Sequence, residues 1–253
     1  MFPVLFLSHG APNTILKETI TKKSLRALKK SLGKPNYILI ISSHWITQDV
    51  EIINPHANKL MYDFYGFEQA LYEFKYKISS SPEMTEDIVK KLPDLKIHIS
   101  DSRRAFDHGV WSVLSMIYET LKIPVIQMSL PLWDATKLFE YGEQLKKLRD
   151  EALIICSGSI THNLYDMEPH FDAPVKEYAK VFNEKIKNAL KEGNKTYILN
   201  HERMELFAHN HPTSEHYMPL IIALGASGNH IGESVNSEFS HSNISMESFI
   251  FKG

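Results

Sequence analysis

The sequence predicts a single α/β domain over residues 1–253, with a central, mostly parallel or mixed sheet flanked by helices. Short apolar runs rich in β-branched residues alternate with amphipathic segments of helical length, as in proteins whose sheet is covered by helices. A chain of 253 residues that is 43% hydrophobic can bury a full core without disulfide bonds. No internal repeat, low-complexity tract or long linker divides the pattern.

Short apolar runs along the chain have the length and the β-branched content of strands. Several are apolar throughout, as expected of strands that are buried on both faces. The predicted strands are Val4–Leu7, Tyr37–Ile41, Val50–Ile53, Lys96–Ile99, Pro124–Met128, Ala152–Cys156 and Ser248–Phe251.

The segments between these runs are predicted to be helices. Residues Thr14–Leu32 place isoleucine and leucines among lysines, and Gly33 supplies a stop signal. Ser81 followed by Pro82 has the pattern of a helix start, with serine as N-cap and proline at the first helical position. The further predicted helices are Val110–Leu121, Asp134–Glu151, Val175–Glu192 and Tyr217–Leu224.

Charge and cysteine content exclude several classes of partner. The 28 basic and 30 acidic residues nearly balance, so the chain has no electrostatic attraction to nucleic acid or to an anionic membrane. The single cysteine, Cys156, lies in an apolar run and indicates a reducing compartment. Residues Phe2–Leu7 lack the basic region of a signal peptide, and no uncharged run approaches ~18 residues. We therefore expect a cytoplasmic protein, as a monomer or small homo-oligomer, that acts on a small molecule.

Three of the 13 histidines follow predicted strands in similar sequence contexts. His9 follows the first strand, His44 follows the second, and His162 comes shortly after the strand that begins at Ala152. Ligands of open α/β sheets bind at the carboxyl ends of the strands, so these imidazoles are expected to meet at one edge. A lone histidine after a strand is more often a hydrogen-bonded structural residue, but three equivalent positions favour a site.

Two further segments add histidines to this prediction. The turn-like stretch His209–Tyr217 combines His211, Glu215 and His216, and His108 stands in an Asp-His-Gly turn. Imidazole and carboxylate donors without thiolate suit one Fe(II), Zn(II) or Mn(II) ion. The role of His209 stays open, and the remaining histidines are interpreted as structural; these are His56, His98, His170, His201, His230 and His241.

Six short motifs in a fixed order make the sequence resemble the class III extradiol ring-cleaving dioxygenases of the 4,5-DOPA dioxygenase type, over nearly the whole chain. The motifs are Ser8–Pro12, Ser43–Trp45, Tyr62–Phe67, Asp107–Trp111, Gly158–Leu164 and His211–His216. The sequence departs from that family's pattern at Glu68, where proline is usual, and at Phe106, where smaller aliphatic residues are commoner. Both positions bear on the substrate mouth.

The resemblance implies a buried mononuclear metal site. It assigns metal ligation to His9, His44 and His216, with His162 as either a fourth ligand or the acid/base residue. His108 and His211 match further site histidines, which are expected to carry protons. The resemblance also implies Fe(II) for dioxygenase activity, with Zn(II) a plausible bound ion, and a catechol and dioxygen as substrates.

The neighbouring residues Glu215 and His216 offer alternative ligands. A carboxylate beside two histidines would suit a non-haem Fe(II) oxygenase, but adjacent side chains point in different directions, so one of the two reaches the metal. The resemblance favours His216. Glu215 is then expected either to orient a ligand imidazole or to be solvated.

Aromatic residues flank the motif histidines and are candidates for a water-excluding slot that binds a planar ring. These candidate substrate-binding residues are Trp45, Tyr62, Trp111 and Tyr217, with Phe64 nearby; core packing is the alternative for each. Two other functions also fit the histidines, namely a zinc hydrolase and a metal-binding protein of the same fold without turnover. Oxygen consumption distinguishes a dioxygenase from both.

Overall fold

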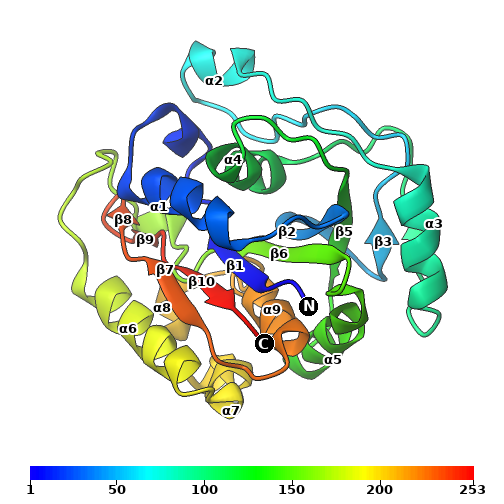
Figure 1. Cartoon of the computed structure of the whole chain (residues 1–253). Helices are drawn as coiled ribbons and strands as arrows, with labels where there is room; N and C mark the ends of the chain where they lie inside the picture. The colour runs from blue at the N-terminus through cyan, green and yellow to red at the C-terminus, as the bar shows by residue number, and fades with distance from the viewer.

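The computed structural model describes residues 1–253 as one mixed sheet with helices on both faces, which confirms the predicted fold class (Figure 1). The strand order is β4-β3-β5-β2-β6-β1-β10-β7. The four central strands run parallel; β10 pairs antiparallel with β1, and β7 pairs antiparallel with β10. The strands are β1 (Val4–Ser8), β2 (Tyr37–Thr47), β3 (Glu51–Ile52), β4 (His98–Ile99), β5 (Val125–Pro131), β6 (Ala152–Gly158), β7 (Glu233–Asn236) and β10 (Ser248–Phe251), with a separate hairpin of β8 (Phe239–Ser240) and β9 (Ile244–Ser245).

Helices cover the two faces of this sheet, with α1 and α4 on one side and α5 and α9 on the other (Figure 1). Helices α5 and α9 approach closely, because a Cβ atom at Gly225 would lie only 2.1 Å from the carbonyl oxygen of Phe139. The helices are α1 (Ile20–Leu28), α2 (Gln69–Glu73), α3 (Pro82–Lys91), α4 (His108–Ile117), α5 (Ala135–Leu145), α6 (Glu177–Lys191), α7 (Lys195–Leu199), α8 (Phe207–Asn210) and α9 (Met218–Ser227). Short 3₁₀ turns occupy Pro12–Leu16, Lys29–Ser31, Lys146–Leu148, Leu164–Asp166 and His201–Arg203.

The central strands are apolar throughout because both of their faces are buried. Along β2, Tyr37, Leu39 and Ile41 pack in the cluster that contains α5 and α9. The intervening Ile38 and Ile40 pack in the cluster that contains α1 and α4. The sheet therefore separates two hydrophobic layers and fixes which side chains reach its carboxyl edge.

The structure corrects several predicted boundaries. The first predicted helix begins at Ile20 rather than Thr14, because Thr19 accepts a hydrogen bond from the backbone N–H of Lys22 and caps the helix there. The second strand continues to Thr47, so His44 lies within β2 rather than after it. The predicted cap at Ser81 is confirmed, since its hydroxyl accepts from the N–H of Met84. None of the helices is both long and apolar enough to cross a membrane.

Candidate metal centre

Three imidazoles from distant parts of the chain converge at the carboxyl edge of the sheet. The Nε2 atom of His44 lies 3.0 Å from Nε2 of His9 and 3.3 Å from Nε2 of His216. His9 and His216 are 2% and 4% exposed, whereas the side chain of His44 is 22% exposed. We call these three residues the histidine triad. One edge of the triad is therefore open to solvent and the rest is enclosed.

Local backbone features bring the triad together. Gly10 adopts a φ of +63° directly after His9, a left-handed conformation that turns the chain away from β1. In β2 the pairing with β5 jumps from Ile41–Met128 to Ile46–Leu130, so extra residues of β2 bulge outward at His44. His216 lies just before α9, and its carbonyl oxygen accepts from the N–H of Ser159 at 2.9 Å.

Hydrogen bonds fix the tautomers of two triad members. The Ser157 hydroxyl donates to the carbonyl of Gly109 at 2.6 Å, so it can only accept from Nδ1–H of His9 at 2.9 Å. The Glu215 carboxylate accepts from Nδ1–H of His216 at 3.0 Å. Both imidazoles therefore direct an Nε2 lone pair towards His44, an arrangement typical of metal-ligating histidines held by a carboxylate or hydroxyl.

Burial keeps these imidazoles neutral. It lowers the pKa of His9 and of His216 well below the usual value, and the neighbouring histidines lower both further. Facing lone pairs repel one another unless a cation or a proton lies between them. Ligand nitrogens around a tetrahedral ion with bonds of 2.0–2.1 Å are about 3.3 Å apart, close to the spacing of the triad. The triad thus fits one divalent metal ion of the kind that binds imidazole.

His162 stacks on a triad member instead of completing the triad. Its ring lies 3.5 Å from that of His216 with an interplanar angle of 9°. The lone pairs of the two stacked rings lie in two nearly parallel planes, and the rings are 3.5 Å apart, so one ion ~2 Å from both nitrogens cannot lie in both planes. This geometry disfavours His162 as a fourth ligand and leaves it beside the triad. Burial, with a smaller contribution from the nearby His108, lowers the pKa of His162 to about 4.

His108 borders the triad on the other side, and an aspartate holds it there. His108 is the first residue of α4, and its ring centroid lies 4.0 Å from that of His44. Its Nδ1 lies 3.0 Å from Oδ1 of Asp63, which also accepts the His108 backbone N–H at 2.9 Å. The second Asp63 oxygen lies 3.7 Å from Nδ1 of His44. Despite partial burial, the contacts with His108 bring the pKa of Asp63 down to about 2.

His211 lies deeper in the protein, away from the triad nitrogens. Its Nε2–H donates to the carbonyl of Ile160 at 2.7 Å, and its ring stacks on Phe207. The other ring nitrogen, Nδ1, is buried without a hydrogen-bond partner. The structure therefore places His211 as a neutral imidazole with one free acceptor position.

A buried carboxylate behind the triad escaped the sequence interpretation. Asp107, which is fully buried, accepts from the Ser42 hydroxyl at 2.7 Å and from Arg104 at 2.6 Å, and it also accepts from the Gln127 amide. These partners join β2, β5 and the start of α4. A Cβ atom at Gly109 would lie 2.3 Å from Oγ of Ser42, so only glycine fits between α4 and this network. The motif around His108 thus serves packing as well as chemistry.

The aromatic residues do not form one slot around the triad. Trp111 is fully buried, donates from Nε1 to the carbonyl of Met61 and stacks on Phe74. Tyr217 is also fully buried, and its hydroxyl donates to the carbonyl of Ile198. Neither side chain presents surface to a ligand, which favours core packing, the alternative given for each, over the predicted substrate-binding role.

Two other aromatic candidates lie nearer the triad. Trp45, next to His44, is 6% exposed and lies under the guanidinium of Arg104 at 4.6 Å. The Tyr62 hydroxyl donates to the carbonyl of Phe74 at 2.7 Å, and its ring packs edge-on against Phe64. Phe64 in turn lies 5.6 Å from the ring of His108. Phe64 is therefore the aromatic candidate in contact with His108, whereas Tyr217 contacts His211 from within the core.

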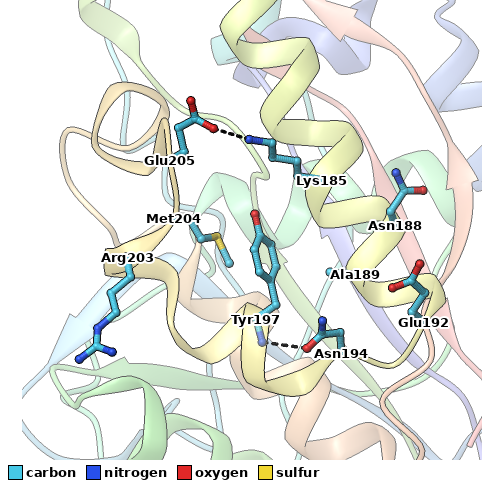
Figure 2. Close-up of a pocket in the computed structure, with 9 residues that line it drawn as sticks. All are labelled: Lys185, Asn188, Ala189, Glu192, Asn194, Tyr197, Arg203, Met204 and Glu205. Carbon is cyan, nitrogen blue, oxygen red and sulfur yellow. Dashed lines mark hydrogen bonds and ion pairs between the residues drawn. The ribbon is translucent and has the colours of Figure 1, made fainter.

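His209, whose role the sequence left open, stacks on Tyr178 at 3.8 Å outside the triad. A separate hollow of about 490 Å³ between α6 and α7 also contains none of the site histidines (Figure 2). Its polar groups satisfy one another, since Lys185 pairs with Glu205 at 2.6 Å and Asn194 accepts from the N–H of Tyr197 (Figure 2). The chemistry of this protein therefore centres on the histidine triad.

An α/β sheet with imidazoles meeting at its carboxyl edge, and with further histidines beside them, is typical of a metal-dependent enzyme. The family model of the catalytic LigB subunit of aromatic ring-opening dioxygenases matches residues 3–252, so the chain belongs to that family.

Individual relatives agree with this assignment. The chain is 34% identical to the 4,5-DOPA dioxygenase extradiol of Escherichia coli K12 over 235 residues, which cover 88% of this chain and 84% of that protein. It is 35% identical to the 4,5-DOPA dioxygenase extradiol of Beta vulgaris over 231 residues, covering 88% and 86%. The crystal structure of the uncharacterized protein JW3007 from Escherichia coli K12 superposes with a TM-score of 0.85 at 28% identity, covering 99% of this chain and all of that one. The sequence-based prediction of an extradiol ring-cleaving dioxygenase is thereby confirmed.

Proposed function

We propose that this protein cleaves the ring of a DOPA-like catechol at an Fe(II) ion held by His9, His44 and His216. The observation that carries the proposal is that Nε2 of His44 lies 3.0 Å from Nε2 of His9 and 3.3 Å from Nε2 of His216. Membership of the ring-opening dioxygenase family supports the reaction class. When bound, the ion would lower the pKa of a coordinated hydroxyl and bring catechol and dioxygen together.

The reaction consumes one catechol and one dioxygen molecule. A carbon–carbon bond of the ring next to the diol breaks, and both oxygen atoms enter the product. One becomes part of a carboxylic acid and the other part of an aldehyde, so no external reductant is required. The protein must therefore remove hydroxyl protons from the catechol and return protons as the ring opens.

Two histidines beside the triad are suited to these proton transfers. We assign His162, stacked on His216, and His108, next to His44, as the residues that accept and return protons. Asp63 supports this assignment for His108, because a carboxylate 3.0 Å from Nδ1 favours a proton on that nitrogen and leaves Nε2 free as a base. Burial of His162 favours its neutral, proton-accepting form. Asp63 acts through His108 and is a positioning residue.

Anaerobic reconstitution with Fe(II) tests the function. Addition of DOPA and simple catechols is expected to start oxygen uptake together with the formation of a yellow ring-opened semialdehyde. Protein loaded with Zn(II) instead is expected to consume no oxygen. Turnover of esters or amides by the zinc form, without oxygen uptake by the iron form, would replace this proposal with a zinc hydrolase.

A further inference from the structure

A groove of about 700 Å³ lies next to the histidine triad. Glu215 belongs to both features, because it lines the groove and its carboxylate holds Nδ1 of His216 at 3.0 Å. Ile46 near the end of β2 and Leu130 and Pro131 at the end of β5 also line the groove. The groove therefore lies beside the triad at the carboxyl edge of the sheet.

One wall of the groove is apolar and exposed. Leu132 and Ile46 are 62% and 43% exposed, and Trp133 lies beside them. Large aliphatic side chains gathered on a concave surface are typical of ligand-binding sites. This wall suits the hydrocarbon part of a substituent on an aromatic ring.

The charged side chains that line the groove are both carboxylates. His211 also lines it, but its Nδ1 is buried and its Nε2–H is bonded to the carbonyl of Ile160, so the negative charge of the groove comes from acidic residues alone. Glu202 and Glu215 supply the two carboxylates, and none of the 15 lining residues is lysine or arginine. Arg203, which follows Glu202, lines the separate hollow between α6 and α7 instead (Figure 2).

We propose that this groove binds the ring substituent of the catechol and selects substituents that carry an ammonium group over those that carry a carboxylate. This inference rests on the proposed function. An ammonium group would be attracted by Glu202 and Glu215, whereas a carboxylate would meet like charges without a basic partner.

Two catechols of similar length test the selection, one with an aminoethyl and one with a propionate substituent, with 4-ethylcatechol as the neutral reference. The iron-loaded protein is expected to favour the amine by about tenfold in kcat/KM, chiefly through KM. Glu202→Gln should reduce that preference and Glu202→Lys should abolish or reverse it. Glu192→Lys, in the hollow of Figure 2, reverses a charge far from the groove and should leave the preference unchanged.

The possible results separate this inference from the proposed function. Equal kcat/KM for the amine and the propionate, or equal effects of Glu202→Lys and Glu192→Lys, would overturn the groove assignment. If even 4-ethylcatechol is not turned over, the proposed function fails. In that case the affinities of the amine and the propionate for the zinc-loaded protein, measured by calorimetry, still show whether the groove prefers the ammonium group to the carboxylate. Thermal melts of each variant identify any that does not fold. If Glu202→Lys does not fold, Glu202→Gln takes its place in the comparison.

Discussion

A single methyl group added at Gly158 is expected to disturb the triad. The new Cβ atom of Gly158→Ala would lie 2.2 Å from the carbonyl oxygen of His216, a backbone atom that cannot rotate away. An ordinary contact needs the two atoms to separate by about 1 Å more. Catalytic groups tolerate displacements of only about 0.5 Å, so His216 would leave its position in the triad. We expect about 10²-fold lower activity, weaker metal retention and a stability loss of about 1–3 kcal/mol.

Metal content after dialysis and oxygen uptake of the iron-loaded protein measure this effect. Gly193→Ala is the matched control, because Gly193 has a φ of +67°, lies at the end of α6 and has Ile231, Asn229 and His230 as its nearest neighbours instead of a triad residue. The strain of alanine in that conformation costs about 1–2 kcal/mol, so stability should fall while metal content stays normal. A Gly158→Ala protein with wild-type metal content and uptake within about twofold of wild type would refute the proposed rigidity of this contact.

Four other predictions follow from individual contacts. His216→Ala should abolish metal retention more completely than Glu215→Ala. If metal analysis finds less metal in Glu215→Ala than in His216→Ala, the third ligand is Glu215. Asp63→Asn should lower kcat about 10²-fold at normal metal content, with partial recovery in Asp63→Glu; unchanged kcat would remove Asp63 from the proton path. His211, whose pKa burial lowers to about 3, stays neutral in the fold while the unfolded chain takes up a proton below about pH 6.5. The free energy of unfolding of the metal-free protein should therefore fall by about 2 kcal/mol between pH 7.5 and 5.0 through His211 alone. Urea melts should show a smaller fall over this pH range for His211→Phe. Burial raises the pKa of the Cys156 thiol, so a thiol reagent should modify it only after denaturation; rapid labelling of native protein would contradict its burial.

The central strands and the meeting of His9 and His44 could be predicted from local pattern, whereas His216, which lies just before α9, was assigned only by the family resemblance. Strands buried on both faces are apolar throughout, which makes β1, β2, β5 and β6 visible in the sequence. Parallel strands share a carboxyl edge, so histidines at their ends meet whatever the loops do. The register jump in β2 has no such signature, because it depends on pairing with β5.

The supporting residues could not be predicted because their roles depend on tertiary contacts. Ser157 orients His9 across two neighbouring strands, and Asp63 reaches His108 from a loop 45 residues earlier. Proximity in sequence also misled the interpretation of Tyr217, which follows His216 directly but points into the core. Successive side chains leave the backbone in different directions, so a neighbour of a ligand need not face the metal.

The central position of β1 has a consequence for how the protein matures during synthesis. This strand is made before its partners β6 and β10. At ~5–20 residues per second, β1 waits roughly ten seconds or more for β6. His9 and His216 come together only after the chain through His216 has been made. A metal ion held by both histidines can therefore bind only at this late stage of synthesis or after it.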